Sequence, residues 1–92
     1  MESGESKIPT GNFAAPRNTV IHTSVDLGAL VRQQRKRLAL KQLDIAGLGN
    51  TGNRFIVELE SGKPTLQLQK VLGVLDLLGL EVVVRPKTDS VP

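Results

Sequence analysis

The chain has 92 residues, with 12 Lys and Arg against 9 Asp and Glu and a net charge of +3. This length allows one domain, and the absence of Cys excludes disulfides, thiolate nucleophiles and sulfur-ligated metals. With a single His and no Tyr or Trp, the sequence offers no nucleophile–base pair and no metal-ligand cluster. We therefore expect neither an enzyme nor a cofactor.

Residues 1–22 are expected to form a flexible N-terminal arm. They are rich in Gly, Ser, Pro, Asn and Thr, so they cannot bury enough apolar surface to offset the entropy lost on ordering. The first residues lack the basic and apolar regions of a signal peptide. Polar residues interrupt the apolar segment 66–80, which is therefore too polar for a membrane span. We expect a cytoplasmic protein without a membrane partner.

The domain itself is expected over residues 23–79 and opens with a helix capped by Thr23 or Ser24. Thr23 and Asp26 have the spacing of a capping box. The side chains that form one helical stripe are Leu27, Leu30, Val31, Gln34 and Leu38.

A block of basic residues without an acid lies on or just after this helix: Arg32, Arg35, Lys36, Arg37 and Lys41. Such a block suits a polyanionic partner such as nucleic acid. Taken alone, it is equally compatible with a solvated helix face.

Two short helices separated by a tight turn are expected next, over 42–48 and 53–60. In the turn, Gly49–Gly52, glycine and asparagine tolerate the left-handed conformation that a sharp change of direction requires. The expected inward side chains are either Leu43 or Ile45, together with Ala46, Leu48, Ile56 and Leu59. A pair of helices of this size is how helix-turn-helix proteins hold a reading helix against DNA.

A fourth helix is expected to open at Pro64 and Thr65, with Thr65 as its N-cap, and to end at Gly79. Its leucines and valines cover more than one face, which indicates a second contact surface beyond the core.

The segment 80–85 alternates β-branched and polar residues, which is typical of a strand. A single strand leaves its backbone groups unpaired, so we expect it to pair with its own copy across a homodimer. The residues expected at this dimer contact are Leu80, Val82, Val83 and Val84. Residues 86–92 are expected to form a flexible tail.

The middle of the chain follows the pattern L-x-Q-x-x-L-A … I-x-x-I-E-x-G-K through Leu40, Gln42, Ile45, Ala46, Ile56, Leu59, Glu60, Gly62 and Lys63. In this it resembles the Cro-like phage repressors, also called the XRE family. The first helix, the fourth helix and the terminal strand are similar to one branch, the HipB-like antitoxins. Proteins of that branch are homodimers with paired C-terminal strands, and they repress their own operon and bind a HipA-like serine/threonine kinase toxin.

The resemblance implies that the second short helix reads DNA bases through Asn53, Arg54 and Glu58. Asn can pair with adenine, Arg can donate two hydrogen bonds to guanine, and a carboxylate can accept from cytosine. The residues implied to contact phosphate are Gln42, Lys41, Arg32 and Lys36.

The resemblance also implies a structural ion pair between Arg35 and Glu60, joining the first helix to the third. The chain departs from the family pattern at Gly52, where a capping Ser or Thr is common, and this leaves Thr51 as the alternative cap. Some HipB-like proteins anchor their toxin through a C-terminal aromatic residue, which this chain lacks.

The sequence thus predicts an all-α helix-turn-helix domain of four main helices plus a C-terminal β-strand that pairs across a homodimer. The expected function is a nucleoid-associated repressor that binds a palindromic double-stranded operator and serves as the antitoxin of a HipA-like kinase toxin. The alternatives are a free-standing phage-type regulator, or a module that neutralises a protein partner and binds DNA weakly.

Overall fold

The computed structural model describes residues 18–87, which form four α-helices in the order α2, α3, α4 and α5. The helices span Ser24–Arg37, Gln42–Leu48, Asn53–Ser61 and Leu68–Leu77 respectively. Most of the expected N-terminal arm and tail, residues 1–17 and 88–92, lies outside the described residues. The expectation of four helices is confirmed, and none of them in residues 18–87 is long and apolar enough to cross a membrane.

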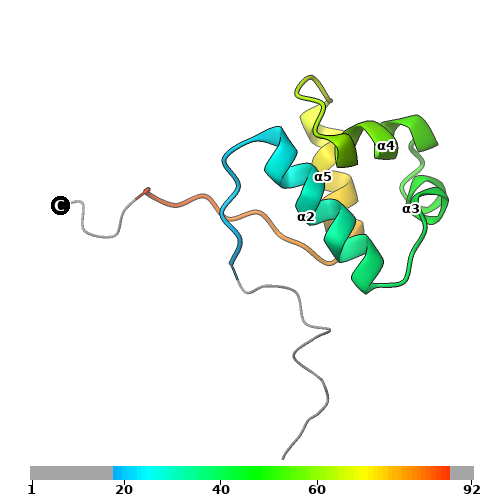
Figure 1. The fold of residues 1–92 in the computed structure, drawn as a ribbon, viewed down its shortest axis with the longest axis horizontal. Coiled ribbons are helices and arrows are strands. Elements are labelled where there is room, and N and C mark those ends of the chain that lie inside the picture. Colours follow the sequence, from blue (N-terminus) through cyan, green and yellow to red (C-terminus); the bar gives the residue numbers. More distant parts are fainter. Residues whose placement is uncertain (1–17, 88–92) are drawn as a thin grey trace, which may run out of the picture.

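The four helices enclose one small apolar core. α2 packs against α4, and α3 packs against both α4 and α5, as Figure 1 shows. The buried apolar side chains are Val31, Ile45, Ala46, Ile56, Leu59, Val71, Val74, Leu75 and Leu78. Every helix contributes to this set, so the core fixes the rotation of each helix about its own axis.

The start of α2 is held by side chains that satisfy its free backbone groups. Thr23 is the N-cap, and its Oγ1 accepts from the backbone N of Asp26 at 3.1 Å. Ser24 instead donates from Oγ to the carbonyl of Gly62 at 2.8 Å, which ties α2 to the end of α4. Within the expected stripe Val31 and Gln34 are buried, whereas Leu38 is 45% exposed because α2 ends at Arg37.

Gly28 lets α2 approach α4 at backbone contact distance. A Cβ atom built on Gly28 would lie 2.4 Å from the carbonyl oxygen of Leu59 and 2.7 Å from that of Glu60. No real side chain tolerates such contacts, so this crossing requires glycine despite its low helix propensity. The stripe of large apolar residues expected for this helix did not include the glycine on which the contact depends.

The helix α5 begins later than expected, at Leu68 with Gln67 as its N-cap and not at Pro64 and Thr65. Residues 64 and 65 form a turn, and Leu66 packs against the core from the connecting segment. The helix therefore begins at Leu68, after the residue that makes this contact. On α5, Leu68, Leu72 and Leu77 are 69%, 37% and 43% exposed, so apolar side chains do lie outside the core.

The segment after α5 is not a strand in the described chain. Gly79 has φ +76, and the backbone N of Leu80 donates to the carbonyl of Leu75 at 2.9 Å, which closes the helix. Residues 81–87 make no backbone–backbone hydrogen bond to any part of the chain from 18 to 87. A strand exists only through a ladder to a neighbour, and residues 18–87 offer no such neighbour.

The close approach at Gly28 makes a matched pair of glycine substitutions informative. Gly28→Ala should sharply lower the urea midpoint, because the new methyl group meets backbone and has no room to move. Gly47→Ala, also in a helix but with nothing within 4 Å of its Cβ position, should raise stability by about 0.5–1 kcal/mol. Urea unfolding is monitored by circular dichroism at 222 nm. Equal midpoints for the two variants would contradict this packing.

Candidate nucleic-acid interface

The site is built on α3, the turn 49–52 and α4. At the start of α3 the carboxylate of Asp44 accepts from the backbone N of Lys41 at 2.7 Å. At its end, the backbone N of Thr51 donates to the carbonyl of Ala46 at 3.0 Å. Ile45 and Ala46 hold α3 on the core, and Figure 1 shows α3 lying beneath α4. Two short helices are thereby fixed against each other with one outer surface in common.

The turn uses its residues differently from what the sequence suggested. Asn50 adopts the left-handed conformation, with φ +54, whereas Gly49 has φ −89 and Gly52 has φ −75. A Cβ on Gly49 would lie 2.9 Å from Cδ1 of Leu77, so a side chain at this position would require the end of Leu77 to shift. Asparagine tolerates the left-handed region better than most residues.

Thr51 does not cap α4. The N-cap is Gly52, which makes no side-chain hydrogen bond. The Oγ1 atom of Thr51 is buried and has no hydrogen-bond partner among residues 18–87. The first backbone N–H groups of α4 therefore have no side-chain cap within the described chain.

One face of α4 is buried and the other is exposed. Ile56 and Leu59 are 0% and 3% exposed, and they fix the rotation of the helix. Asn53 and Arg54 are exposed in its first turn, and Glu58 is half-buried one turn later. The structure thus brings together the three residues that the resemblance assigned to base reading, all away from the core.

Of the other side chains expected to point inward, one open alternative is decided and one assignment needs correction. Ile45 is buried while Leu43 is 67% exposed, so the choice between these two falls on Ile45. Leu48 is 68% exposed, because α3 ends there and its last side chain projects beyond the core.

Glu58 carries two ion pairs on a single oxygen. Its Oε2 lies 3.3 Å from Nε of Arg54 and 3.2 Å from Nζ of Lys63. The hydrogen bond from Lys63 is the largest cause that lowers the pKa of the Glu58 carboxyl. Desolvation opposes it, and the hydrogen bond from Arg54 and the attraction of both charges lower the pKa further.

Arg35 and Glu60 form a bidentate ion pair between α2 and α4. Nε of Arg35 lies 2.6 Å from Oε2 of Glu60, and its Nη2 lies 3.0 Å from Oε1. Their side chains are 11% and 4% exposed. The hydrogen bond to Glu60, opposed by desolvation, raises the pKa of Arg35. The guanidinium of Arg35 is thus positively charged, and the ion pair is nearly excluded from water.

Two more groups complete this ion pair. Nη1 of Arg35 donates to the carbonyl of Leu40 at 2.9 Å, while the carbonyl of Arg35 accepts from the backbone N of Leu40 at 3.1 Å. Nε2 of Gln42 donates to Oε1 of Glu60 at 3.1 Å. The side chain of Gln42, implied as a phosphate contact, is therefore also part of the scaffold that carries α4.

The remaining basic candidates are exposed but not gathered. Lys41 lies at the N-cap of α3, next to the reading face. Arg32 and Lys36 are exposed one turn apart on α2, and no ion pair or hydrogen bond within residues 18–87 joins them to α4. Lys70 of α5, not assigned from the sequence, lies 5.9 Å from the ring centroid of Phe55 in the first turn of α4.

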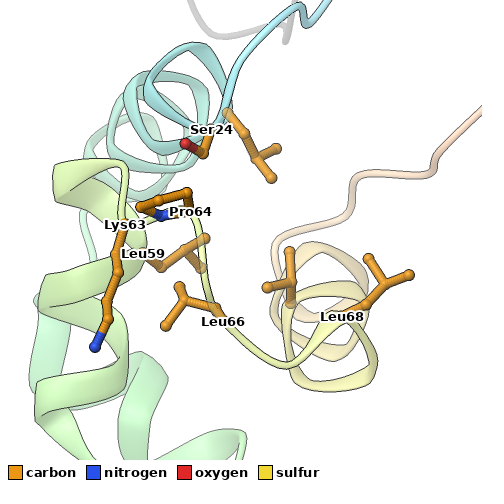
Figure 2. A pocket seen from close by; sticks show the side chains of 8 residues that line it. Ser24, Leu59, Lys63, Pro64, Leu66 and Leu68 are labelled. Carbon is orange, nitrogen blue, oxygen red and sulfur yellow. The ribbon is translucent and has the colours of Figure 1, made fainter.

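A shallow apolar hollow of about 150 Å³ separates the start of α2 from the end of α4 and the start of α5. Figure 2 shows Ser24, Leu59 and Leu66 around it, with the side chain of Lys63 extending away from the hollow. No group of three or more His, Asp or Glu side chains that could hold a metal ion occurs in the described part of the chain.

Comparison with known proteins gives one informative relative. The chain is 53% identical over 62 residues to the uncharacterized HTH-type transcriptional regulator y4mF of Sinorhizobium fredii (strain NBRC 101917 / NGR234). The match covers 67% of this chain and 82% of that protein. No protein-family model matches the chain.

The near-buried ion pair should dominate the stability of the site. Glu60→Ala leaves the charge of Arg35 and the amide of Gln42 without their acceptor, and we expect a loss of about 3 kcal/mol in urea unfolding. Glu58→Ala, which removes an acid from the outer face of the same helix, should leave the midpoint nearly unchanged. A Glu60→Ala protein as stable as the wild type would show that the pair does not hold the helices together.

Proposed function

The chain belongs to the family of helix-turn-helix transcriptional regulators, and we propose that it is a sequence-specific DNA-binding repressor whose helix α4 enters the major groove. The observation that carries this proposal is the outer face of α4. Asn53, Arg54 and Glu58 project there from a helix whose opposite face is locked into the core. Their side chains have the hydrogen-bonding groups that distinguish base edges in the major groove.

The proposed phosphate contacts flank this face. The N-terminus of α3, with Lys41 and Gln42, presents the positive end of the helix dipole and the charge of Lys41, which are of the kind that binds a phosphate. Arg32 and Lys36 of α2 are further candidates, since both are exposed and neither is engaged in an ion pair within residues 18–87. Such contacts would orient α4 without contributing sequence preference.

We propose that the functional unit is a homodimer that places two α4 helices about 34–36 Å apart on a palindromic operator. The contact would be the segment 80–85, in which Val82, Val83 and Val84 are 57%, 66% and 93% exposed. Pairing this segment with its copy would supply the missing ladder and cover the valines, with Leu80 at the base of the strand.

The antitoxin role rests on the resemblance of the helical framework and C-terminal segment to the HipB-like branch of the XRE family. In that role the protein would repress its own operon at the nucleoid and bind a HipA-like kinase toxin. A neighbouring reading frame with kinase sequence motifs would support it. Absence of one would favour a free-standing regulator, and a module that mainly binds protein would show no preference for any DNA sequence.

Selection from a random duplex library tests the DNA-binding proposal. The wild-type protein should enrich a palindromic sequence, and its binding should weaken steeply with salt, by about 0.9 log units per log unit for each phosphate contact. Arg54→Ala should lose about 1–3 kcal/mol of binding and relax the preference at one base position per half-site. No enrichment would overturn the proposal, and equal weakening on all duplexes would make Arg54 a phosphate contact.

The dimer proposal is tested by sedimentation. The double variant Val82→Pro/Val83→Pro removes two successive backbone N–H groups, one of which must face the partner in a two-stranded ladder, so the mass should fall from two chains towards one. Val83→Thr keeps both the N–H and the β-branch and should stay dimeric. A proline variant that sediments like the wild type would rule out the paired strand.

A further inference from the structure

The two cations that flank Glu58 lie on the DNA-facing side of α4 but are already engaged. A single atom, Oε2 of Glu58, accepts from Nε of Arg54 and from Nζ of Lys63. Arg54 is one helical turn before Glu58, while Lys63 follows the end of the helix. The side chains of Arg54, Lys63 and Glu58 are 89%, 44% and 25% exposed. The carboxylate is thus the least exposed member of a surface triad.

The ion pair with Glu58 leaves the terminal N–H groups of Arg54 free. The guanidinium has five N–H groups, and only Nε is used by Glu58. The two terminal nitrogens make no hydrogen bond with any residue from 18 to 87, and together they can form a bidentate contact with guanine. A carboxylate on Nε therefore restricts where the plane of the guanidinium points without competing for the contact with the base.

Lys63, unlike Arg54, carries its charge on a single donor atom. Its ammonium is a point charge at the end of a flexible stem, which suits a phosphate on any sequence. Figure 2 shows its side chain running away from the apolar hollow, and the ion pair places its Nζ at Glu58. A phosphate could recruit Lys63 only by breaking this pair or by approaching the carboxylate itself.

We propose that Glu58 is a positioning residue that sets the ratio of specific to non-specific DNA binding. It orients Arg54 for a guanine and withholds the ammonium of Lys63 from phosphates. Non-specific affinity comes almost wholly from phosphate neutralisation. A carboxylate that pairs with two cations therefore lowers non-specific affinity more than it lowers specific affinity. Discrimination of this kind works against the wrong partner as much as for the right one. The inference rests on the proposed function, and it changes the role of Glu58 from reading a base to controlling Arg54.

The test compares Glu58→Gln with Asp76→Asn, which removes the same charge from an exposed residue of α5 that makes no ion pair within the described chain. Each protein is titrated by fluorescence anisotropy against a random duplex and against the duplex enriched by wild type, at several salt concentrations. Glu58→Gln should bind the random duplex more tightly, with a salt slope steeper by about 0.9 for each phosphate gained. The ratio of the two affinities should fall about fivefold or more, while Asp76→Asn keeps the wild-type ratio.

Two results would overturn the proposal. A ratio that changes equally in both variants would reduce the effect to net charge. A loss on the enriched duplex alone, with the random duplex unchanged, would make Glu58 a direct reader of a base. In the background of Arg54→Ala the proposed guanine contact is already lost, so Glu58→Gln should change the affinity for the enriched duplex less than it does in the wild type. An equally large change in both backgrounds would also count against positioning.

A measurement without DNA separates failure of this inference from failure of the proposed function. The ion pairs lower the pKa of the Glu58 carboxyl, and the hydrogen bond from Lys63 is the largest cause. In a carbon-13 NMR titration of the free protein, Lys63→Met should raise the midpoint of Glu58 towards that of an ordinary glutamate. An unchanged midpoint would show that Lys63 is not held by Glu58, whether or not the protein binds DNA.

Discussion

The guanidinium of Arg35 joins the parts of the domain that must not move relative to one another. Its side chain binds Glu60 of α4 and the carbonyl of Leu40, and its own carbonyl accepts from the backbone of Leu40. Taking this pair out of water is costly, and only good geometry with further hydrogen bonds offsets that cost. The bidentate contact and the amide of Gln42 meet this condition. One charged group thereby fixes α2, the connection to α3, and α4.

The rotation of α4 then decides what its surface can recognise. Glu58 and Glu60 are two residues apart, yet their side chains are 25% and 4% exposed. Glu60 faces α2 because Ile56 and Leu59 are seated in the core. Helical spacing then sends Arg54 and Glu58 outward together, one turn apart. The scaffold pair and the surface pair are separate consequences of one helix orientation, so a change to the outer face need not disturb the fold.

The sequence anticipated the parts of the fold that depend on local periodicity. The bounds of α3 and the burial of Ala46, Ile56 and Leu59 agree with the structure, because the spacing of apolar residues along a helix indicates which of its faces is buried. The resemblance paired Arg35 with Glu60, and the structure places them in contact.

The features that differed depend on distant contacts. The late start of α5 follows from Leu66 packing on the core. The role of Gly28 appears only when the backbone of α4 lies across it. The contact of Glu58 with Lys63 likewise requires the connection after α4 to turn back. A pattern along one chain does not encode such approaches, since each depends on where a second element lies.

The segment after α5 has two unfavourable features, exposed valines and unpaired backbone groups, that one partner could remove together. Its valines are exposed and its backbone from residue 81 makes no hydrogen bond within the described chain. It borders a groove of about 640 Å³ that Leu30 and Leu75 also line, beside residues 18–22. An apolar β-branched segment with unused backbone groups is unfavourable in water and invites pairing. A second copy would satisfy the backbone and cover the valines in the same step, whereas burial by a side chain alone would leave the backbone unpaired. For this reason the proposed dimer accounts for the segment better than the arrangement within residues 18–87 of one chain does.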